Sequence, residues 1–186
     1  MGNFSSEIRL TKKEEQETNR EYDDLIKIAT LFREIIQLAE NAKNNPKNPR
    51  GRLSKIVSIS NKANKLLANA WENYIKLEKD ALALEKRLIR IGVGDKITKE
   101  EKYAIYLVKS IRFGLVYQTG YNQRILKLAS QKYSEYSIIG ATIEIISMAT
   151  LIESHILAIA PHVKTLRRLE ILIEKQERQF AKRGKV

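Results

Sequence analysis

One stretch of the chain, residues 53–91, contains neither Gly nor Pro and carries an apolar residue at every third or fourth position. Alternating spacings of four and three are the heptad pattern of a helix that packs lengthwise against another helix. At 1.5 Å per residue the helix would be about 58 Å long. The pattern does not say whether the partner helix belongs to the same chain. The seam is formed by Ala63, Leu67, Ala70, Tyr74, Leu77, Ala81, Leu84, Leu88 and Ile91.

The rest of the sequence is also poor in turn-forming residues, with three Pro and eight Gly among 186 residues. β-sandwiches and barrels need a turn every 8–12 residues or so, and no segment shows the alternation of a strand. We therefore expect an all-α protein, a long-helix bundle of about five helices with one heptad-patterned helix and an N-terminal helical arm. The expected organisation is a polar arm over residues 1–24 and a single all-α domain over residues 25–186.

Two capping boxes and one linker set the expected helix boundaries. Thr11 with Glu14 predicts a helix over residues 12–42 whose first turns are solvated, so that only the part from Leu25 onward packs. Residues 43–52 form a basic linker that contains two prolines. Thr98 with Glu101 begins a further helix to about residue 133, in which Gly120 is a plausible break or kink. The glycines that begin at Gly92 end the long helix.

Residues 137–160 are the most apolar stretch. The length suits a membrane span, but Glu144, Glu153 and His155 lie within it, and each ionisable group is costly at a bilayer centre. We therefore favour a central helix buried on most sides. Pro161 is expected to break or kink that helix, and a last helix follows from Val163.

The sequence offers little for catalysis. There is no Cys, and the two histidines, His155 and His162, do not follow a Glu at the spacing of a di-iron bundle. No phosphate-binding glycine loop is complete. Glu144 and Glu153 are nine residues apart and point to opposite sides of a helix. We expect a protein that is not an enzyme and uses no cofactor or metal.

The net charge of +12 is concentrated in three segments. Residues 43–55 and residues 102–134 contain no Asp or Glu, and the C-terminal segment is basic. Six of the eight tyrosines lie between residues 103 and 136. On a continuous helix one stripe would join Lys99, Lys102, Tyr103, Tyr106, Lys109, Phe113, Tyr117, Tyr121, Arg124, Lys127 and Gln131.

Such a stripe suits a polyanion, because Lys and Arg neutralise phosphates and tyrosine rings stack on unpaired bases. Tyrosines at helical spacing also border bundle cores, and for the tyrosines alone that interpretation is favoured. No base-reading motif is present, so contact with the backbone is expected. The candidate nucleic-acid-binding residues are Lys43, Lys47, Arg50, Arg52, Lys102, Tyr106, Lys109, Tyr117, Tyr121, Arg124, Lys127, Lys182, Arg183 and Lys185.

The favoured function is a self-assembling protein that binds nucleic acid without reading its sequence, either a nucleoprotein or filamentous virus coat subunit, or a small helical subunit of a nucleic-acid complex. Its expected partners are duplex DNA, favoured over RNA, and copies of itself or a related helical chain. The expected location is intracellular or in a virion, because no secretory signal is visible. One alternative is a membrane-surface or membrane-remodelling protein, since Gly2 and Ser6 fit an N-myristoylation pattern. Another is a structural scaffold for acidic protein partners.

Overall fold

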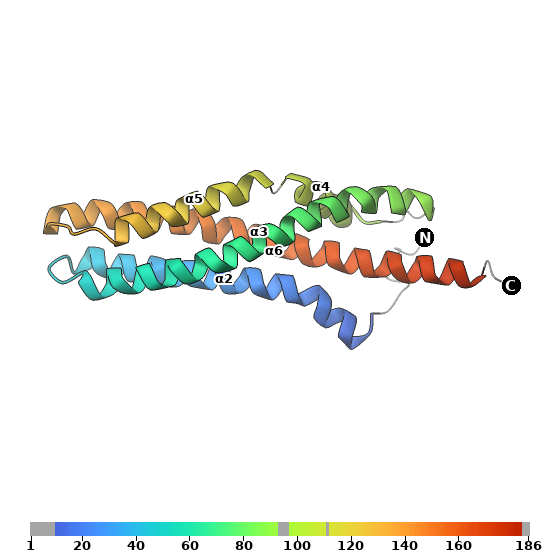
Figure 1. Cartoon of the computed structure of the whole chain (residues 1–186), viewed down its shortest axis with the longest axis horizontal. Coiled ribbons are helices and arrows are strands. Elements are labelled where there is room, and N and C mark those ends of the chain that lie inside the picture. The colour runs from blue at the N-terminus through green and yellow to red at the C-terminus, as the bar shows by residue number, and fades with distance from the viewer. Residues whose placement is uncertain (1–9, 93–96, 111, 184–186) are drawn as a thin grey trace. The chain divides into compact units, whose positions relative to one another are not determined.

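The computed structural model describes residues 10–92, 97–110 and 112–183. The chain is all-α: about 90% of it is helical, and no strand occurs among the described residues (Figure 1). The helices are α2 (Lys12–Asn44), α3 (Arg50–Arg90), α4 (Lys99–Ser110), α5 (Arg112–Ala129) and α6 (Glu135–Arg183). The expected fold class is confirmed, including the long C-terminal helix and the N-terminal helix.

Backbone contacts divide the chain into two compact units. Unit 1 comprises Met1–Asp23, Asn73–Arg112 and Ile159–Val186, and unit 2 comprises Asp24–Glu72 and Phe113–Ala158. Each unit therefore contains segments of α2, α3 and α6, to which unit 1 adds α4 and unit 2 adds α5. The expectation of a polar arm followed by a single domain stays a prediction.

The core of unit 2 is formed by aliphatic and aromatic side chains from all four of its helical segments. Phe32 and Ile35 of α2, Ile56 of α3, Ile125 of α5 and Ile145 of α6 are completely buried. Within unit 2, α2 turns into α3 and α5 turns into α6 at the same end, so the unit is built of two helical hairpins (Figure 1). This arrangement brings the two connecting turns, which are far apart in the sequence, to one end of the unit.

The heptad seam on α3 is used inside the chain. Five of its residues are buried, namely Ala63, Leu67, Ala81, Leu84 and Leu88, while Ala70 and Ile91 are half-buried. The side chains of Tyr74 and Leu77 lie outside the described residues. The sequence left the seam's partner open, and the structure places that partner within the same chain.

The capping boxes form as expected. In the first, the Thr11 backbone N–H donates to Glu14 Oε2 at 2.7 Å and the Glu14 N–H donates to Thr11 Oγ1 at 3.3 Å. In the second, the Thr98 N–H donates to Glu101 Oε2 at 2.7 Å. At the end of α3, Gly92 has a φ of 70°, the left-handed conformation in which glycine commonly terminates a helix.

One expected boundary is wrong, and two expected interruptions do not break their helices. The linker is shorter than residues 43–52, because α2 reaches Asn44 and α3 already begins at Arg50, after Pro49. Gly120 lies inside α5 and does not end it. The segment is instead described as two helices, α4 up to Ser110 and α5 from Arg112. Pro161 does not begin a new helix, since α6 continues through it.

The first turns of α2 are also less solvated than expected. Thr18 is buried, with 3% of its surface exposed. Glu21 accepts hydrogen bonds from Arg167, and Glu14 pairs with Lys175, both on α6. Polar and charged contacts therefore hold this part of α2 against α6 within unit 1.

The interpretation of residues 137–160 as buried on most sides is also wrong. Only 39% of the most apolar 18-residue window of α6 is buried. The Glu135–Gln179 part of α6 is the one described helix that is long and apolar enough to cross a membrane by length and composition.

Candidate nucleic-acid interface

The two acid-free segments of unit 2 lie next to each other. No Asp or Glu occurs in residues 41–71 or in residues 113–134. The first segment supplies the α2–α3 turn and the first part of α3, and the second supplies α5 and the turn that follows. Asn122 of α5 donates through Nδ2 to the Ser60 carbonyl of α3 at 3.0 Å and to Asn64 Oδ1 at 2.6 Å. Two helical segments without carboxylates, the first part of α3 and α5, therefore pack directly on each other.

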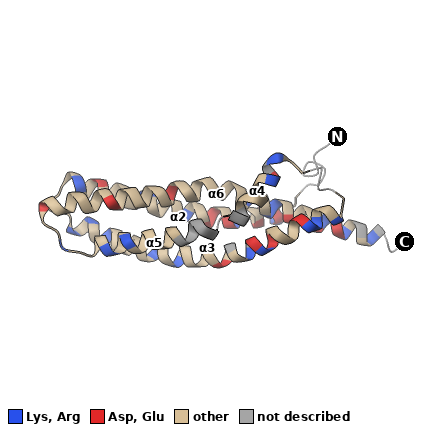
Figure 2. Cartoon of the chain, turned by 90° about the horizontal axis from the view of Figure 1, so that it is seen from above, with Lys and Arg blue, Asp and Glu red and all other residues tan. Residues whose placement is uncertain are grey.

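This acid-free part of unit 2 carries a set of exposed cations that we call the basic side. On α3 the cations recur at intervals of seven and three residues, opposite the buried positions Ile56, Ser60 and Ala63. Figure 2 shows Lys and Arg positions along α5 and the neighbouring part of α3. The members of the basic side are Lys47, Arg50, Lys55, Lys62, Lys65 and Lys127, all exposed.

The α2–α3 turn presents its candidate residues unevenly. Lys47 and Arg50 are exposed, whereas Lys43, in the last turn of α2, and Arg52 are half-buried. The Arg52 guanidinium donates through Nη1 to the Asn48 carbonyl at 3.1 Å. Lys47 and Arg50 are the cations of this turn that are best placed for an external phosphate.

On α5 part of the expected outer stripe faces solvent. Tyr117 is 63% exposed, Arg124 and Lys127 are exposed, and Tyr121 is half-buried. The two tyrosine rings lie with centroids 6.4 Å apart at an interplanar angle of 34°. Tyr121 fits the interpretation of a ring bordering the core, while Tyr117 offers an open ring face.

Arg124 pairs with a carboxylate that lies outside the acid-free segment 113–134. Its Nε donates to Glu144 Oε1 at 2.8 Å and its Nη2 to Glu144 Oε2 at 3.4 Å. The hydrogen bond with Glu144 raises the pKa of Arg124 above its ordinary value. Absence of acids along α5 therefore does not make its whole surface free of negative charge, because α6 contributes Glu144.

The remaining candidates belong to unit 1. On α4, Lys102 and Tyr106 are exposed, as are Lys99 and Tyr103, while Ala104 and Ile105 are buried. Lys182 is exposed near the end of α6. The side chains of Lys109 and Arg183, and all of Gly2 and Lys185, lie outside the described residues, as does the side chain of Phe113 in unit 2. The stripe expected across residues 99–131 is thus divided between two units.

A layer of polar side chains lies inside unit 2, beneath the basic side. Ser60, Gln118 and Asn122 are each at least 98% buried. Ser60 Oγ, both polar atoms of Gln118 and Asn122 Oδ1 have no hydrogen-bond partner in the structure. No sequence pattern predicted this buried layer, because Gln and Asn are also common on exposed helix faces.

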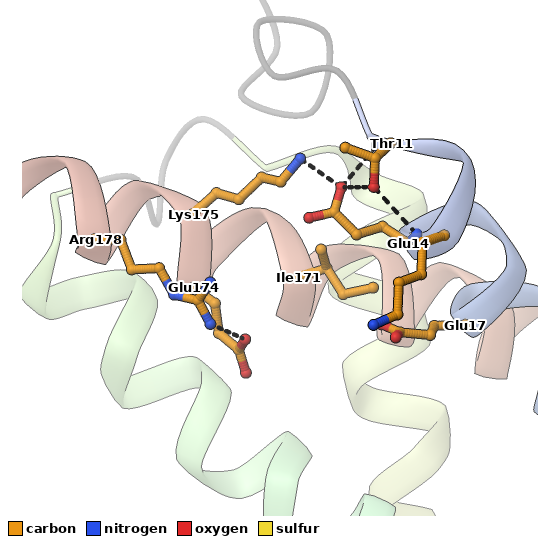
Figure 3. Close-up of a pocket in the computed structure, with 8 residues that line it drawn as sticks. Thr11, Glu14, Glu17, Ile171, Glu174, Lys175 and Arg178 are labelled. Atoms are coloured by element: carbon orange, nitrogen blue, oxygen red, sulfur yellow. Dashed lines mark hydrogen bonds and ion pairs between the residues drawn. The ribbon is translucent and has the colours of Figure 1, made fainter.

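A polar cleft of about 310 Å³ lies in unit 1 between the start of α2 and the end of α6 (Figure 3). Its charged groups largely satisfy one another: Lys175 Nζ lies 2.5 Å from Glu14 Oε2, and Arg178 pairs with Glu174 at 3.7 Å. Lys175 and Thr11 lower the pKa of Glu14 to about 2. We interpret the cleft as a structural ion-pair site.

The described residues offer no group of three or more His, Cys, Asp or Glu side chains that could hold a metal ion. Burial lowers the pKa of His155 and so favours its neutral form. His162 contacts Tyr103 edge to face, with ring centroids 5.1 Å apart.

No protein-family model, curated protein or solved structure gives a significant match to the chain.

Proposed function

We propose that this protein is a non-enzymatic, self-assembling subunit that binds the backbone of nucleic acids without reading their sequence. The observation that carries the proposal is the basic side of unit 2, where two acid-free helical segments pack together. Lys47, Arg50 and Lys127 are exposed, and no described carboxylate pairs with them. Regularly spaced phosphates are the ligand that such a surface neutralises best.

Two further features support a polyanion over an acidic protein partner. The basic side extends from the α2–α3 turn along α3, where Lys55, Lys62 and Lys65 offer several cations to a chain of phosphates. Tyr117 adds an open ring that can stack on an unpaired base. Duplex DNA remains the favoured ligand. Binding to single strands, whose bases are unpaired, tests the contribution of the Tyr117 ring.

The test is the salt dependence of binding to a labelled duplex of about 30 base pairs with arbitrary sequence. Each phosphate contact contributes about −0.9 to the slope of log affinity against log salt. Changing Lys62, Lys65 and Lys127 to Gln should therefore flatten the slope by about 2.7 and lower the affinity for duplexes of unrelated sequence equally. Arg124 is left unchanged, because its removal would free the Glu144 carboxylate.

A matched control removes three exposed cations from the unit 1 part of α3, namely Lys76, Lys79 and Lys86. This variant has the same net charge as the first. If both variants change the slope equally, the effect comes from total charge and the basic side is not the interface. Lack of duplex binding by the unchanged protein at low salt would refute the proposal.

A further inference from the structure

The outer face of α6 in unit 2 repeats a heptad pattern that nothing in the described structure covers. The repeat alternates spacings of four and three residues, and none of its members is charged. We call these residues the outer seam. They are Tyr136, Gly140, Ile143, Ser147, Thr150, Ser154 and Leu157, and all are exposed.

The outer seam and its borders gather much of the exposed apolar surface. Of ten large hydrophobic side chains exposed among the described residues, five lie here: Tyr136 at 92%, Ile139 at 38%, Ile143 at 53%, Leu151 at 52% and Leu157 at 37%. A group of exposed apolar side chains along one helix marks an interaction surface, whereas isolated exposed side chains are ordinary.

Ion pairs border the outer seam on both sides. Glu144 is held by Arg124 of α5, and Glu153 by Arg33 of α2 at 2.7 Å. Glu144 and Glu153 point to opposite sides of α6, so the strip between them is uncharged. An apolar strip with a charged rim is the arrangement of a protein interface.

We infer that the outer seam binds α6 of a second copy of this chain, in antiparallel orientation. Four of the seven members, Gly140, Ser147, Thr150 and Ser154, are small or polar, which lets another helix approach closely and gives lipid chains little apolar surface. Gly140, Ser147 and Ser154 recur every seven residues between larger side chains, which lets two helices approach closely and interdigitate. The inference deepens the self-assembly part of the proposed function and rests on it.

Charge determines the orientation. The end of unit 2 where α6 begins also carries Lys47 and Arg50, and a parallel pair would place these basic ends together (Figure 1). Antiparallel packing separates them by about the length of the seam. Residues 136–158 span about 34 Å, several times the Debye length of about 8 Å at physiological salt.

The area of the outer seam predicts a reversible dimer. A strip about 34 Å long and about 11 Å wide covers about 400 Å² on each copy, or about 800 Å² together. Stable complexes bury about 1,200–2,000 Å². We therefore expect association that depends on concentration in the micromolar range or above.

Analytical ultracentrifugation of the full chain, without nucleic acid, tests the dimer. Between about 1 µM and 300 µM, the mass should rise from 21.4 kDa toward twice that value. Ile143→Lys should weaken the dimer at least about tenfold, since it places a charge in the interface. The control Leu82→Lys, on α3 of unit 1, changes a side chain of nearly equal exposure, 52% against 53%, and should leave the dimer unchanged.

Cysteine crosslinking tests the orientation, because the chain has no Cys of its own. In an antiparallel pair centred on the seam, Ser147→Cys should form an intermolecular disulfide and Gly140→Cys should not. Crosslinking at both positions would refute the antiparallel arrangement.

Three outcomes would overturn the inference: a monomer at every concentration, equal effects of Ile143→Lys and Leu82→Lys, or a monomer that binds phosphatidylcholine vesicles through Ile143. Duplex binding separates this inference from the proposed function. If the protein binds duplex but stays monomeric, the dimer inference fails together with self-assembly, and backbone binding stands. If it dimerises but does not bind duplex, nucleic-acid binding fails and the outer seam stands.

Discussion

Arg167 is the side chain whose removal should most damage unit 1. Its guanidinium joins three helices: Nη2 donates to Glu21 Oε1 of α2 at 2.7 Å, and Nη1 donates to Glu170 Oε2 of α6 at 2.6 Å and to Asp80 Oδ2 of α3 at 3.3 Å. One cation thus holds three carboxylates. Arg167→Met would keep most of the apolar stem while leaving those carboxylates without a counter-charge.

The magnitude follows from the burial of the four groups. Breaking a fully buried ion pair by removing one partner costs about 3–5 kcal/mol. The Arg167 and Glu170 side chains are only 17% and 12% exposed, but Asp80 is 34% exposed and partly screened by water. We therefore expect Arg167→Met to lower the free energy of unfolding by about 2–3 kcal/mol at neutral pH.

The loss of unfolding free energy in Arg167→Met should depend on pH in a defined direction. Burial already raises the pKa of Glu170 above 4.5, and hydrogen bonds from Arg167 oppose that rise. In Arg167→Met the folded state therefore holds protons more tightly than the unfolded state. Stability then falls as pH rises from about 4.5 through the raised pKa, so the deficit is largest at neutral pH and shrinks in acid.

Urea unfolding followed by far-UV circular dichroism, at pH 7 and at about pH 4.5, measures both effects. Arg178→Met is the matched control, because it removes the same charge from α6 at a site that is 77% exposed and 3.7 Å from Glu174. The control should change stability by less than about 0.5 kcal/mol. Equal losses in the two variants, or a deficit for Arg167→Met that is the same at both pH values, would refute the reasoning.

Two other predictions concern the polar groups of α2 and α5. Because the pKa of Glu14 is about 2, the stability that its carboxylate gives to the first turn of α2 is present above pH 4.5 and is lost as pH falls toward 2. An NMR titration should give a pKa near 2 for this carboxylate and a higher pKa in Lys175→Gln. A pKa near 4.5 in the unchanged protein would contradict this. Gln118 is buried without a partner for either polar atom, so Gln118→Leu should raise the free energy of unfolding by about 1–3 kcal/mol. Asn122→Leu removes two hydrogen bonds and should lower it, and destabilisation by both variants to the same extent would show that Gln118 has a partner.

The fold class was predictable because local signals and packing agree over most of the chain. The boxes at Thr11 and Thr98 specify helix starts from backbone hydrogen bonds that form within three residues. Gly92 specifies a helix end by its backbone conformation. Such signals depend little on tertiary contacts, which explains why they could be read from the sequence.

At Pro161 the burial of neighbouring side chains outweighs the local tendency of proline to break a helix. A proline inside a helix costs about 3 kcal/mol, because it removes one hydrogen bond and crowds the preceding turn. Ile159, Val163 and Leu166 on either side of it are buried, and each such side chain contributes about 1.5–3 kcal/mol. Their combined burial offsets the cost, so α6 continues. A single sequence does not reveal how much a segment buries, and therefore did not reveal this outcome.

Charge patterns were informative where side chains are exposed whatever the packing, and less so on helices. Lys47 lies in a turn, and its exposure follows from its position there. Arg124 lies on a helix, and its neighbour Glu144 is 20 residues away in the sequence but at hydrogen-bond distance. The converse holds for the first part of α3, up to residue 71, and for α5. Each segment contains no Asp or Glu, but only the contact between Asn122 and Ser60 brings the two together in unit 2. A charged window therefore becomes a candidate interface only when the helices packed beside it are also free of the opposite charge.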